Sequence, residues 1–305
     1  MARYVTVGSI SHDPRLPFKG NLAGLLDHAA HMLRRAAHYG ADIVSFPETY
    51  PHLVLDGKPA DLAEPVSGPT ITRVAAEARK NGLHVIMPLY TSENGRVYNS
   101  SVLISPKGDV IGVYHKMHPT IGEIESGITP GTQPSVFRTA FGKVGLAICF
   151  DLNFPDAMRG LADNGAEIIF FSSAYRGGLQ LQIWAFELGV YIVSAILAEL
   201  GRIVDQSGSV LAESTYEELA ARRINLDRRL LHMDYNWDKM DAMLEKYGAG
   251  ISFDYFTREA CYAVASERDD LTVDDLIREF GLEERRAYWQ RSNKVRADAL
   301  AALKD

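Results

Sequence analysis

The chain has few cysteines, no long apolar stretch and no excess of positive charge. Its 305 residues include only 2 cysteines, which excludes the disulfide framework of small secreted domains. The net charge of −7 argues against a nucleic-acid-binding surface. The longest apolar run, 183–198, is interrupted by Glu187 and is short for a membrane span. Residues 1–4 lead into a strand pattern without the apolar core of a signal peptide. We therefore expect a cytoplasmic protein with neither a nucleic-acid nor a membrane partner.

What the sequence contains is an ordinary globular composition, with 47% hydrophobic and 23% charged residues. From residue 4 to residue 226, β-prone segments alternate with segments of helical apolar spacing. Extra hairpins interrupt this alternation, as at 97–104 and 110–114. The pattern indicates helices packed on sheets in layers rather than a plain doubly wound sheet.

The pattern changes at residue 227. Segments such as 274–281 and 297–304 are charged and helix-prone. We therefore predict one domain over residues 1–227 and a helical C-terminal extension over residues 228–305. The extension is expected to pack on the body of the protein or on a partner subunit.

Three reactive side chains follow predicted strands: Glu48, Lys116 and Cys149. A thiol is a weak nucleophile at neutral pH and needs a base or a nearby positive charge. A carboxylate can take its proton, and an ammonium can stabilise both a thiolate and a later oxyanion. Each residue also has a plainer interpretation, namely a small core residue for Cys149, a surface carboxylate for Glu48 and a solvated charge for Lys116. A lowered pKa of the Cys149 thiol would favour catalysis.

Short segments around these residues occur in the order that is typical of a known family. They are Phe46-Pro-Glu-Thr49, Tyr98-Asn-Ser100, Gly112-Val-Tyr-His-Lys116, Gly127 with Val136-Phe137, Gly145-Leu-Ala-Ile-Cys-Phe-Asp151 with Phe154-Pro155, and Gly201-Arg-Ile-Val-Asp205 with Gly208. On these segments, which span about residues 3–227, the chain resembles the nitrilase superfamily of carbon–nitrogen hydrolases.

The resemblance implies an α/β fold, a four-layer α-β-β-α sandwich of the nitrilase type, here with a helical C-terminal tail. It identifies residues 1–227 as the carbon–nitrogen hydrolase domain. It also implies a homodimer, or a higher homo-oligomer, assembled through helices next to the cysteine.

The resemblance further implies Cys149 as the nucleophile, Glu48 as the general base and Lys116 as the stabiliser of the oxyanion. The backbone amide of Phe150 is the expected second oxyanion donor. A further carboxylate shortly after the lysine is functional in many members, and Glu123 fits that place better than its competitor, Glu125.

Tyr175 and Arg176 follow another predicted strand on the side of Cys149, where family members often bind substrate. They could contact a polar or anionic substrate end, although an ordinary loop with Gly177 and Gly178 explains them equally well. Asn153 stands where many members have an arginine, so the contacts of that arginine cannot be assumed. Arg159 matches a structural arginine and is expected to pair with a carboxylate.

No metal and no organic cofactor is implied for the reaction. His115 and His118 form a His-x-x-His pair, but that spacing is uninformative on a loop, and Lys116 between them would repel a cation.

The implied reaction is the hydrolysis of a non-peptide carbon–nitrogen bond through a thioester, with release of ammonia or an amine. Asp151 with Phe154-Pro155 resembles amidase-type members, which favours a small linear amide or N-carbamoyl compound as substrate. The alternative is a nitrilase that converts a nitrile to a carboxylic acid, because the segment from Lys116 to Glu123 looks more like that branch. A non-catalytic interaction protein that keeps the fold is disfavoured by the presence of all three reactive residues.

Overall fold

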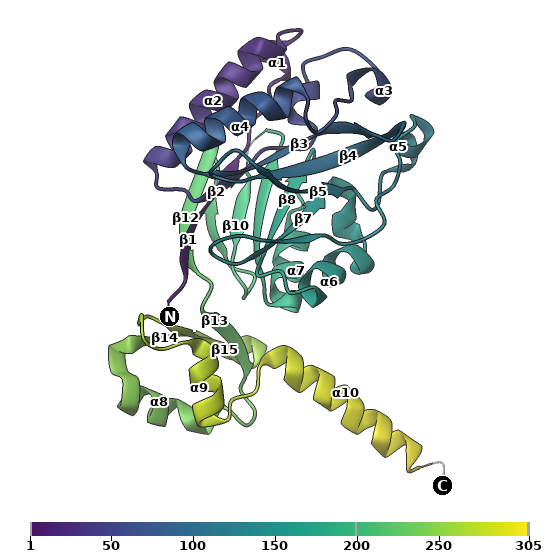
Figure 1. The fold of residues 1–305 in the computed structure, drawn as a ribbon. Helices are drawn as coiled ribbons and strands as arrows, with labels where there is room; N and C mark the ends of the chain where they lie inside the picture. Colours follow the sequence, from purple (N-terminus) through teal and green to yellow (C-terminus); the bar gives the residue numbers. More distant parts are fainter. Residues whose placement is uncertain (1, 199, 304–305) are drawn as a thin grey trace. The chain divides into compact units, whose positions relative to one another are not determined.

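The computed structural model describes residues 2–198 and 200–303, which divide into two compact units (Figure 1). The larger unit is Val5–Ile224. The smaller unit combines residues 2–4 with residues 225–303. Among the helices in the described ranges, none has the length and hydropathy that a membrane crossing requires.

The first sheet of the larger unit has six strands in the order β12-β1-β2-β3-β4-β5. Neighbours are parallel from β1 to β3 and antiparallel from β3 to β5. The strands are β1 (Tyr4–Ile10), β2 (Ile43–Ser45), β3 (His84–Glu93), β4 (Arg96–Ile104), β5 (Val110–His115) and β12 (Leu219–Asn225).

The second sheet also has six strands, in the order β11-β10-β9-β8-β7-β6. Its central strands, β7 to β9, are parallel, and the strands outside them are antiparallel to their neighbours. The strands are β6 (Val136–Arg138), β7 (Lys143–Ile148), β8 (Ile168–Ser173), β9 (Tyr191–Ile196), β10 (Arg202–Val204) and β11 (Val210–Glu213).

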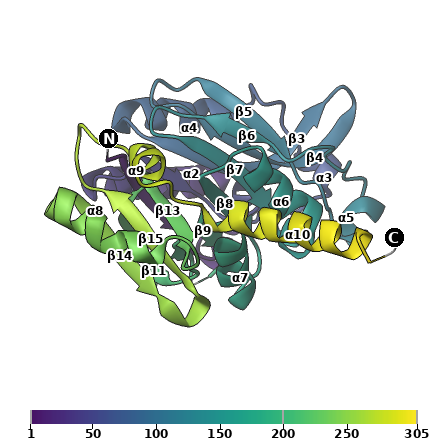
Figure 2. The ribbon, with the colours of Figure 1, turned by 90° about the horizontal axis from the view of Figure 1, so that it is seen from below.

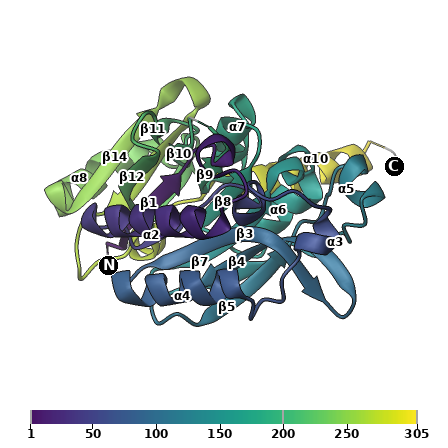
Figure 3. The same cartoon turned by 90° about the horizontal axis from the view of Figure 1, so that it is seen from above.

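Helices cover the outer face of each sheet. From above, α2 (Leu22–His38) and α4 (Pro69–Asn81) lie over the first sheet (Figure 3), and their apolar residues share a core with its strands. From below, α6 (Pro155–Asp163) and α7 (Leu179–Leu188) lie over the second sheet (Figure 2), again with a shared core. The shorter helices are α1 (Arg15–Phe18), α3 (Pro59–Leu62) and α5 (Ile121–Glu125). The larger unit is therefore the predicted four-layer α-β-β-α sandwich.

Polar contacts join the two sheets where their inner faces meet. The hydroxyl of Ser45 at the end of β2 lies 3.0 Å from the hydroxyl of Ser172 in β8. The Ser9 hydroxyl donates to the Ser194 carbonyl at 2.6 Å, which links β1 to β9. These buried groups satisfy one another, and they fix the ends of β2 and β8 close together.

The smaller unit contains helices, as expected, and a three-stranded antiparallel sheet that the sequence interpretation missed. The strands, in the order β13-β15-β14, are β13 (Arg228–His232), β15 (Cys261–Ser266) and β14 (Ile251–Phe256); the helices are α8 (Met240–Tyr247), α9 (Val273–Phe280) and α10 (Arg285–Ala301). Every residue of β15 is buried, and Val264 lies in one core with Met243 and Leu276. The strands were missed because each is short and is flanked by charged, helix-prone sequence.

Gly131 holds the segment that carries Lys116 by close backbone contact. Its N–H donates to the Lys116 carbonyl at 2.8 Å. A Cβ at this position would lie 2.1 Å from the carbonyl oxygen of His115, and a backbone atom cannot swing aside as a flexible side chain can. Only glycine allows this approach.

We predict that Gly131→Ala destabilises the larger unit by about 1–3 kcal/mol, because the added methyl must displace the end of β5. The matched control is Gly122→Ala in α5, where a Cβ meets nothing within 4 Å. Chemical denaturation measures both free energies of unfolding. The proposed packing is wrong if Gly131→Ala unfolds at the same denaturant concentration as the control.

Candidate active site

A buried ammonium lies at the centre of the site. Lys116, the first residue after β5, is 1% exposed. Its Nζ lies 2.8 Å from Glu48 Oε1, and 2.8 and 3.0 Å from the two carboxylate oxygens of Glu123. Glu48 follows β2, and Glu123 lies in α5. The fold thus brings together three of the predicted site residues from separate segments of the chain.

Asn99 in β4 joins the two carboxylates. Its Nδ2 donates to Glu48 Oε1 at 2.9 Å and to Glu123 Oε1 at 2.8 Å. Its backbone carbonyl accepts the Lys116 N–H at 2.8 Å. The sequence interpretation quoted Asn99 only as part of a family segment and did not assign it to the site. No spacing rule would have found it, because its role depends on the pairing of β4 with β5.

The second oxygen of Glu48 faces a different element. Glu48 Oε2 accepts the N–H of Ala174, which follows β8, at 3.1 Å. The side chain therefore spans the two sheets, with one oxygen toward Lys116 and the other toward the end of β8. The following residue, Thr49, has φ +49°, an unusual value for a non-glycine residue, so the chain turns sharply after the carboxylate.

Cys149 lies on a strained turn directly after β7. It has φ +47° and begins a short 3-10 helix, Cys149–Asn153. Left-handed backbone at a non-glycine residue costs free energy and is concentrated at functional sites. Its side chain is partly exposed and lies within electrostatic range of Glu48 and Lys116, whose charges shift its pKa in opposite directions. The Phe150 amide lies in the first turn of the 3-10 helix, where N–H groups lack an intrahelical acceptor.

Asp151 joins the cysteine turn to the lysine segment. Its buried carboxylate accepts the Ile148 N–H at 2.9 Å and the Tyr114 hydroxyl at 2.7 Å through Oδ2. Through Oδ1 it accepts the His118 N–H at 2.8 Å. Tyr114 and His118 flank Lys116 in the chain. The same carboxylate therefore fixes the positions of the nucleophile and of the ammonium.

The charges of the cluster set the pKa values of its members. Burial and the negative charge of Glu48 raise the pKa of Cys149 to about 12, against the opposing effect of Lys116. Burial alone would lower the pKa of Lys116, but Glu48, Cys149 and Glu123 together raise it. Burial alone would raise the pKa of Glu123, but the ammonium of Lys116 lowers it. The resting site thus holds a neutral thiol and an ammonium. The pKa of the Cys149 thiol is raised, whereas the sequence analysis named a lowered pKa as the sign of a catalytic thiol.

Tyr175 and Arg176 follow β8 but differ in their surroundings. The Tyr175 hydroxyl is buried and lacks a hydrogen bond of ordinary length among the described residues. Burial and the nearby Cys149 raise its pKa to about 12, so the hydroxyl and the thiol interact electrostatically. Arg176 is exposed, and the described part of the chain offers it no ion pair. Of this predicted pair, Tyr175 is the one near the thiol.

The other predicted positions lie outside the cluster. Glu125 is exposed and does not contact Lys116. His115 Nδ1 lies 2.8 Å from the Ser100 hydroxyl, whereas His118 Nε2 lies 3.0 Å from Asp156, so the two imidazoles face different partners.

Arg159 bears out the expectation that it pairs with a carboxylate. Its Nη2 lies 3.3 Å from Glu187 Oε2. Asn153, at the position of the family arginine, donates to the Phe150 carbonyl at 3.2 Å and accepts from Gln180 at 2.9 Å.

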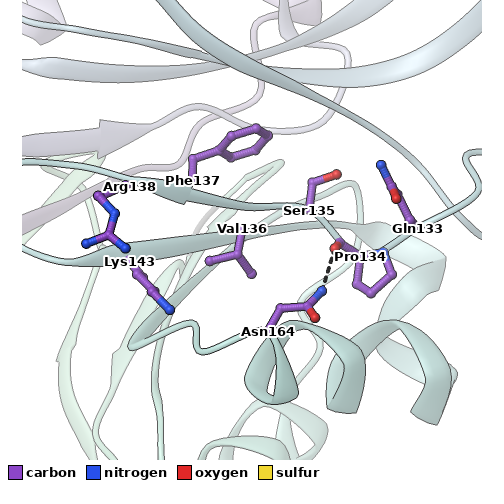
Figure 4. A pocket seen from close by; sticks show the side chains of 8 residues that line it. All are labelled: Gln133, Pro134, Ser135, Val136, Phe137, Arg138, Lys143 and Asn164. Atoms are coloured by element: carbon purple, nitrogen blue, oxygen red, sulfur yellow. Dashed lines mark hydrogen bonds between the residues drawn. The ribbon is translucent and has the colours of Figure 1, made fainter.

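A separate pocket of about 420 Å³ lies beside β6 and the end of α6 (Figure 4). Arg138 and Lys143 line it from adjacent strands, and Asn164 closes one side by donating to the Pro134 carbonyl at 3.0 Å. Its lining includes none of the residues that surround Lys116. This pocket is therefore distinct from the ammonium cluster.

Comparisons with known proteins agree with the geometry. The sequence model of the carbon–nitrogen hydrolase family matches residues 6–229. Deaminated glutathione amidase of Mus musculus is 31% identical over 235 residues, 65% of this chain and 72% of that protein. N-carbamoylputrescine amidase of Solanum lycopersicum is 34% identical over 155 residues, 48% of this chain and 52% of that protein.

Solved structures show the same fold. An amidase from Nesterenkonia sp. superposes with a TM-score of 0.62 at 19% identity, covering 80% of this chain and 96% of that one. A carbon–nitrogen hydrolase from Helicobacter pylori G27 superposes with a TM-score of 0.63 at 21% identity. The match covers 73% of this chain and 90% of that one. With the family match over most of its length, the chain belongs to the carbon–nitrogen hydrolases of the nitrilase superfamily and is an amidase-like enzyme.

Proposed function

We propose that the chain hydrolyses a linear amide or an N-carbamoyl compound through a thioester on Cys149. The observation that carries this proposal is the cluster around the Lys116 ammonium, in which Glu48 bonds Lys116 and both charges act on the thiol of Cys149. The proposed general base, oxyanion stabiliser and nucleophile thus belong to one electrostatically coupled cluster.

The raised pKa of Cys149 implies that proton removal accompanies attack. The carboxylates of Glu48 and Glu123 and the ammonium of Lys116 sum to one negative charge, and a free thiolate would add a second in a buried place. Glu48 therefore takes the thiol proton as sulfur bonds to the substrate carbon, which moves the negative charge onto the substrate oxygen.

Lys116 is suited to stabilise that oxygen and unsuited to move protons. Its raised pKa keeps it an ammonium throughout the neutral range. An ammonium has three N–H donors, and here they face three carboxylate oxygens, two of them on Glu123, so one donor can turn from Glu123 to the oxyanion. The Phe150 amide supplies a second donor from the same turn as the sulfur.

Glu123 acts chiefly as a positioning residue in this proposal. Both of its oxygens contact Lys116, and Oε2 also accepts the Thr120 N–H at 2.8 Å. Glu48, once protonated, returns the proton to the leaving nitrogen and then activates water for hydrolysis of the thioester. The carbon–nitrogen bond breaks as ammonia or an amine leaves, and water restores the thiol.

The substrate class is inferred from the relatives. Three of the four proteins reported above are named as amidases, one of them an amidase of a carbamoyl compound. This favours amide or carbamoyl substrates over nitriles. Tyr175, with its buried hydroxyl beside Cys149, is the proposed contact for a polar group of the substrate.

We predict ammonia or amine release from linear amides and N-carbamoyl compounds, and none from the matched nitriles. Cys149→Ala should lower kcat by more than about 10,000-fold, because the nucleophile is lost while the fold remains. Cys261→Ala is the matched control, since that thiol lies in β15 of the smaller unit. Release from nitriles alone, or equal losses in both variants, would contradict the proposal.

We also predict that Glu48→Gln lowers the pKa of Cys149 although it abolishes turnover. Removing the carboxylate charge removes a cause of the raised pKa, and the Lys116 ammonium then favours the thiolate, so the pKa falls toward the ordinary value of about 8.5. Thiolate absorbance against pH measures this in a Cys261→Ala background. A pKa that stays at about 12 in Glu48→Gln would show that the two side chains are uncoupled.

The proposed homo-oligomer has support from α7, which covers the second sheet. Leu179 and Ile183 on this helix are 68% and 49% exposed, which is unusual for two neighbouring large apolar side chains. A second copy of the chain would bury them.

Ile183→Asp should therefore reduce the sedimentation coefficient to that of a monomer, because a charge would be buried at the contact. The control, Tyr39→Asp, lies at the end of α2 in the opposite outer layer and is also exposed. An unchanged coefficient for Ile183→Asp would exclude α7 from the contact.

A further inference from the structure

A second polar cluster lies in the larger unit, formed by His12, His28 and Glu218. His12 follows β1, His28 lies on α2, and Glu218 precedes β12. One potential ligand atom from each side chain lies within 4.8 Å of the others. The backbone fixes two of the segments together, because the Ser11 N–H donates to the Glu218 carbonyl at 2.9 Å.

The ligand atoms lack other partners. His12 is 6% exposed, and the Nε2 atoms of His12 and His28 are buried without a hydrogen bond of acceptable geometry among the described residues. His28 Nε2 lies 3.3 Å from Glu218 Oε2. Buried nitrogens of this kind normally have a partner, so two such imidazoles grouped with one carboxylate indicate a site for an ion.

The surroundings keep His12 in the form that binds metals. Its Nδ1 lies 3.5 Å from the Tyr50 hydroxyl, which can accept a hydrogen bond from Nδ1–H and so favour the tautomer with a free lone pair on Nε2. Glu218 has φ +55°, an unusual value for a non-glycine residue.

We propose that His12, His28 and Glu218 bind one divalent transition-metal ion, in the first instance zinc, through two imidazole nitrogens and one carboxylate oxygen. Imidazole ligands select zinc and its neighbours over magnesium or calcium. Ligand atoms of a tetrahedral zinc site are about 3.3 Å apart, so the His28–Glu218 pair already fits, and His12 needs only a small side-chain movement.

The site is accessible to an ion from solvent, and a bound ion would link several elements of the larger unit. The Glu218 side chain is 38% exposed, so it provides access from solvent and leaves the fourth position to water. The ion would join β1, α2 and the segment before β12. It would also contact the network of Tyr50, two residues after the proposed base Glu48, and so stiffen that turn.

The test is zinc titration of the tag-free full chain by calorimetry, after removal of metals by a chelator. The protein carries Cys149→Ala, so that zinc cannot bind the active-site thiol. We expect one zinc per chain. His12→Asn and His28→Gln should each weaken binding by more than about 100-fold, because a direct ligand is lost. His38→Gln, an exposed histidine at the end of the same helix, should bind zinc as before.

Absence of zinc binding, or equal binding by the His12 and His28 variants and the control, overturns the proposal. Should either variant unfold, anomalous diffraction from zinc-soaked crystals of the Cys149→Ala protein decides the matter. A peak between the two Nε2 atoms supports the site, and a peak elsewhere refutes it. Because turnover is not measured, the outcome is independent of the proposed hydrolase function.

Discussion

The structure of the site depends on one ammonium that is buried between two carboxylates. Lys116 is out of contact with water, and Glu48 and Glu123 supply the compensation that water would otherwise give. Removing one partner of such a group leaves an uncompensated charge, which is far more costly than replacing the whole cluster. The cluster is therefore maintained as a unit, and Asn99 makes it rigid by bonding both carboxylates.

The double sheet is what brings these groups together. Glu48 follows β2 in the first sheet, whereas Cys149 follows β7 in the second. The Ser45–Ser172 contact and the bond from the Ala174 amide to Glu48 hold the two sheet ends in register. The left-handed backbone at Cys149 then directs the thiol toward the carboxylate. Strain at the turn is balanced by the bonds that Asp151 makes to both neighbouring segments.

The periodicities of the strands and helices predicted layers of helix packed on sheet, and the resemblance to the nitrilase superfamily supplied the four-layer sandwich. It located Glu48, Lys116 and Cys149 because each stands at a strand end within a family segment. Asn99 was missed because its role arises from the register between β4 and β5. The raised pKa of Cys149 could not be read from the sequence, because it arises from burial and from the charge of Glu48 in the folded chain. The sheet of the smaller unit was not predicted because strands such as β15 lie within charged, helix-prone sequence.

The central claim is that the Glu48–Lys116 pair makes Cys149 a nucleophile that forms a thioester. It is tested most directly by rapid acid quenching during turnover of a linear amide, followed by mass spectrometry of the digested protein. The account predicts that the peptide containing Cys149 gains the mass of the acyl group and loses it on treatment with hydroxylamine. Turnover with that peptide unmodified and the acyl group on another residue would contradict it.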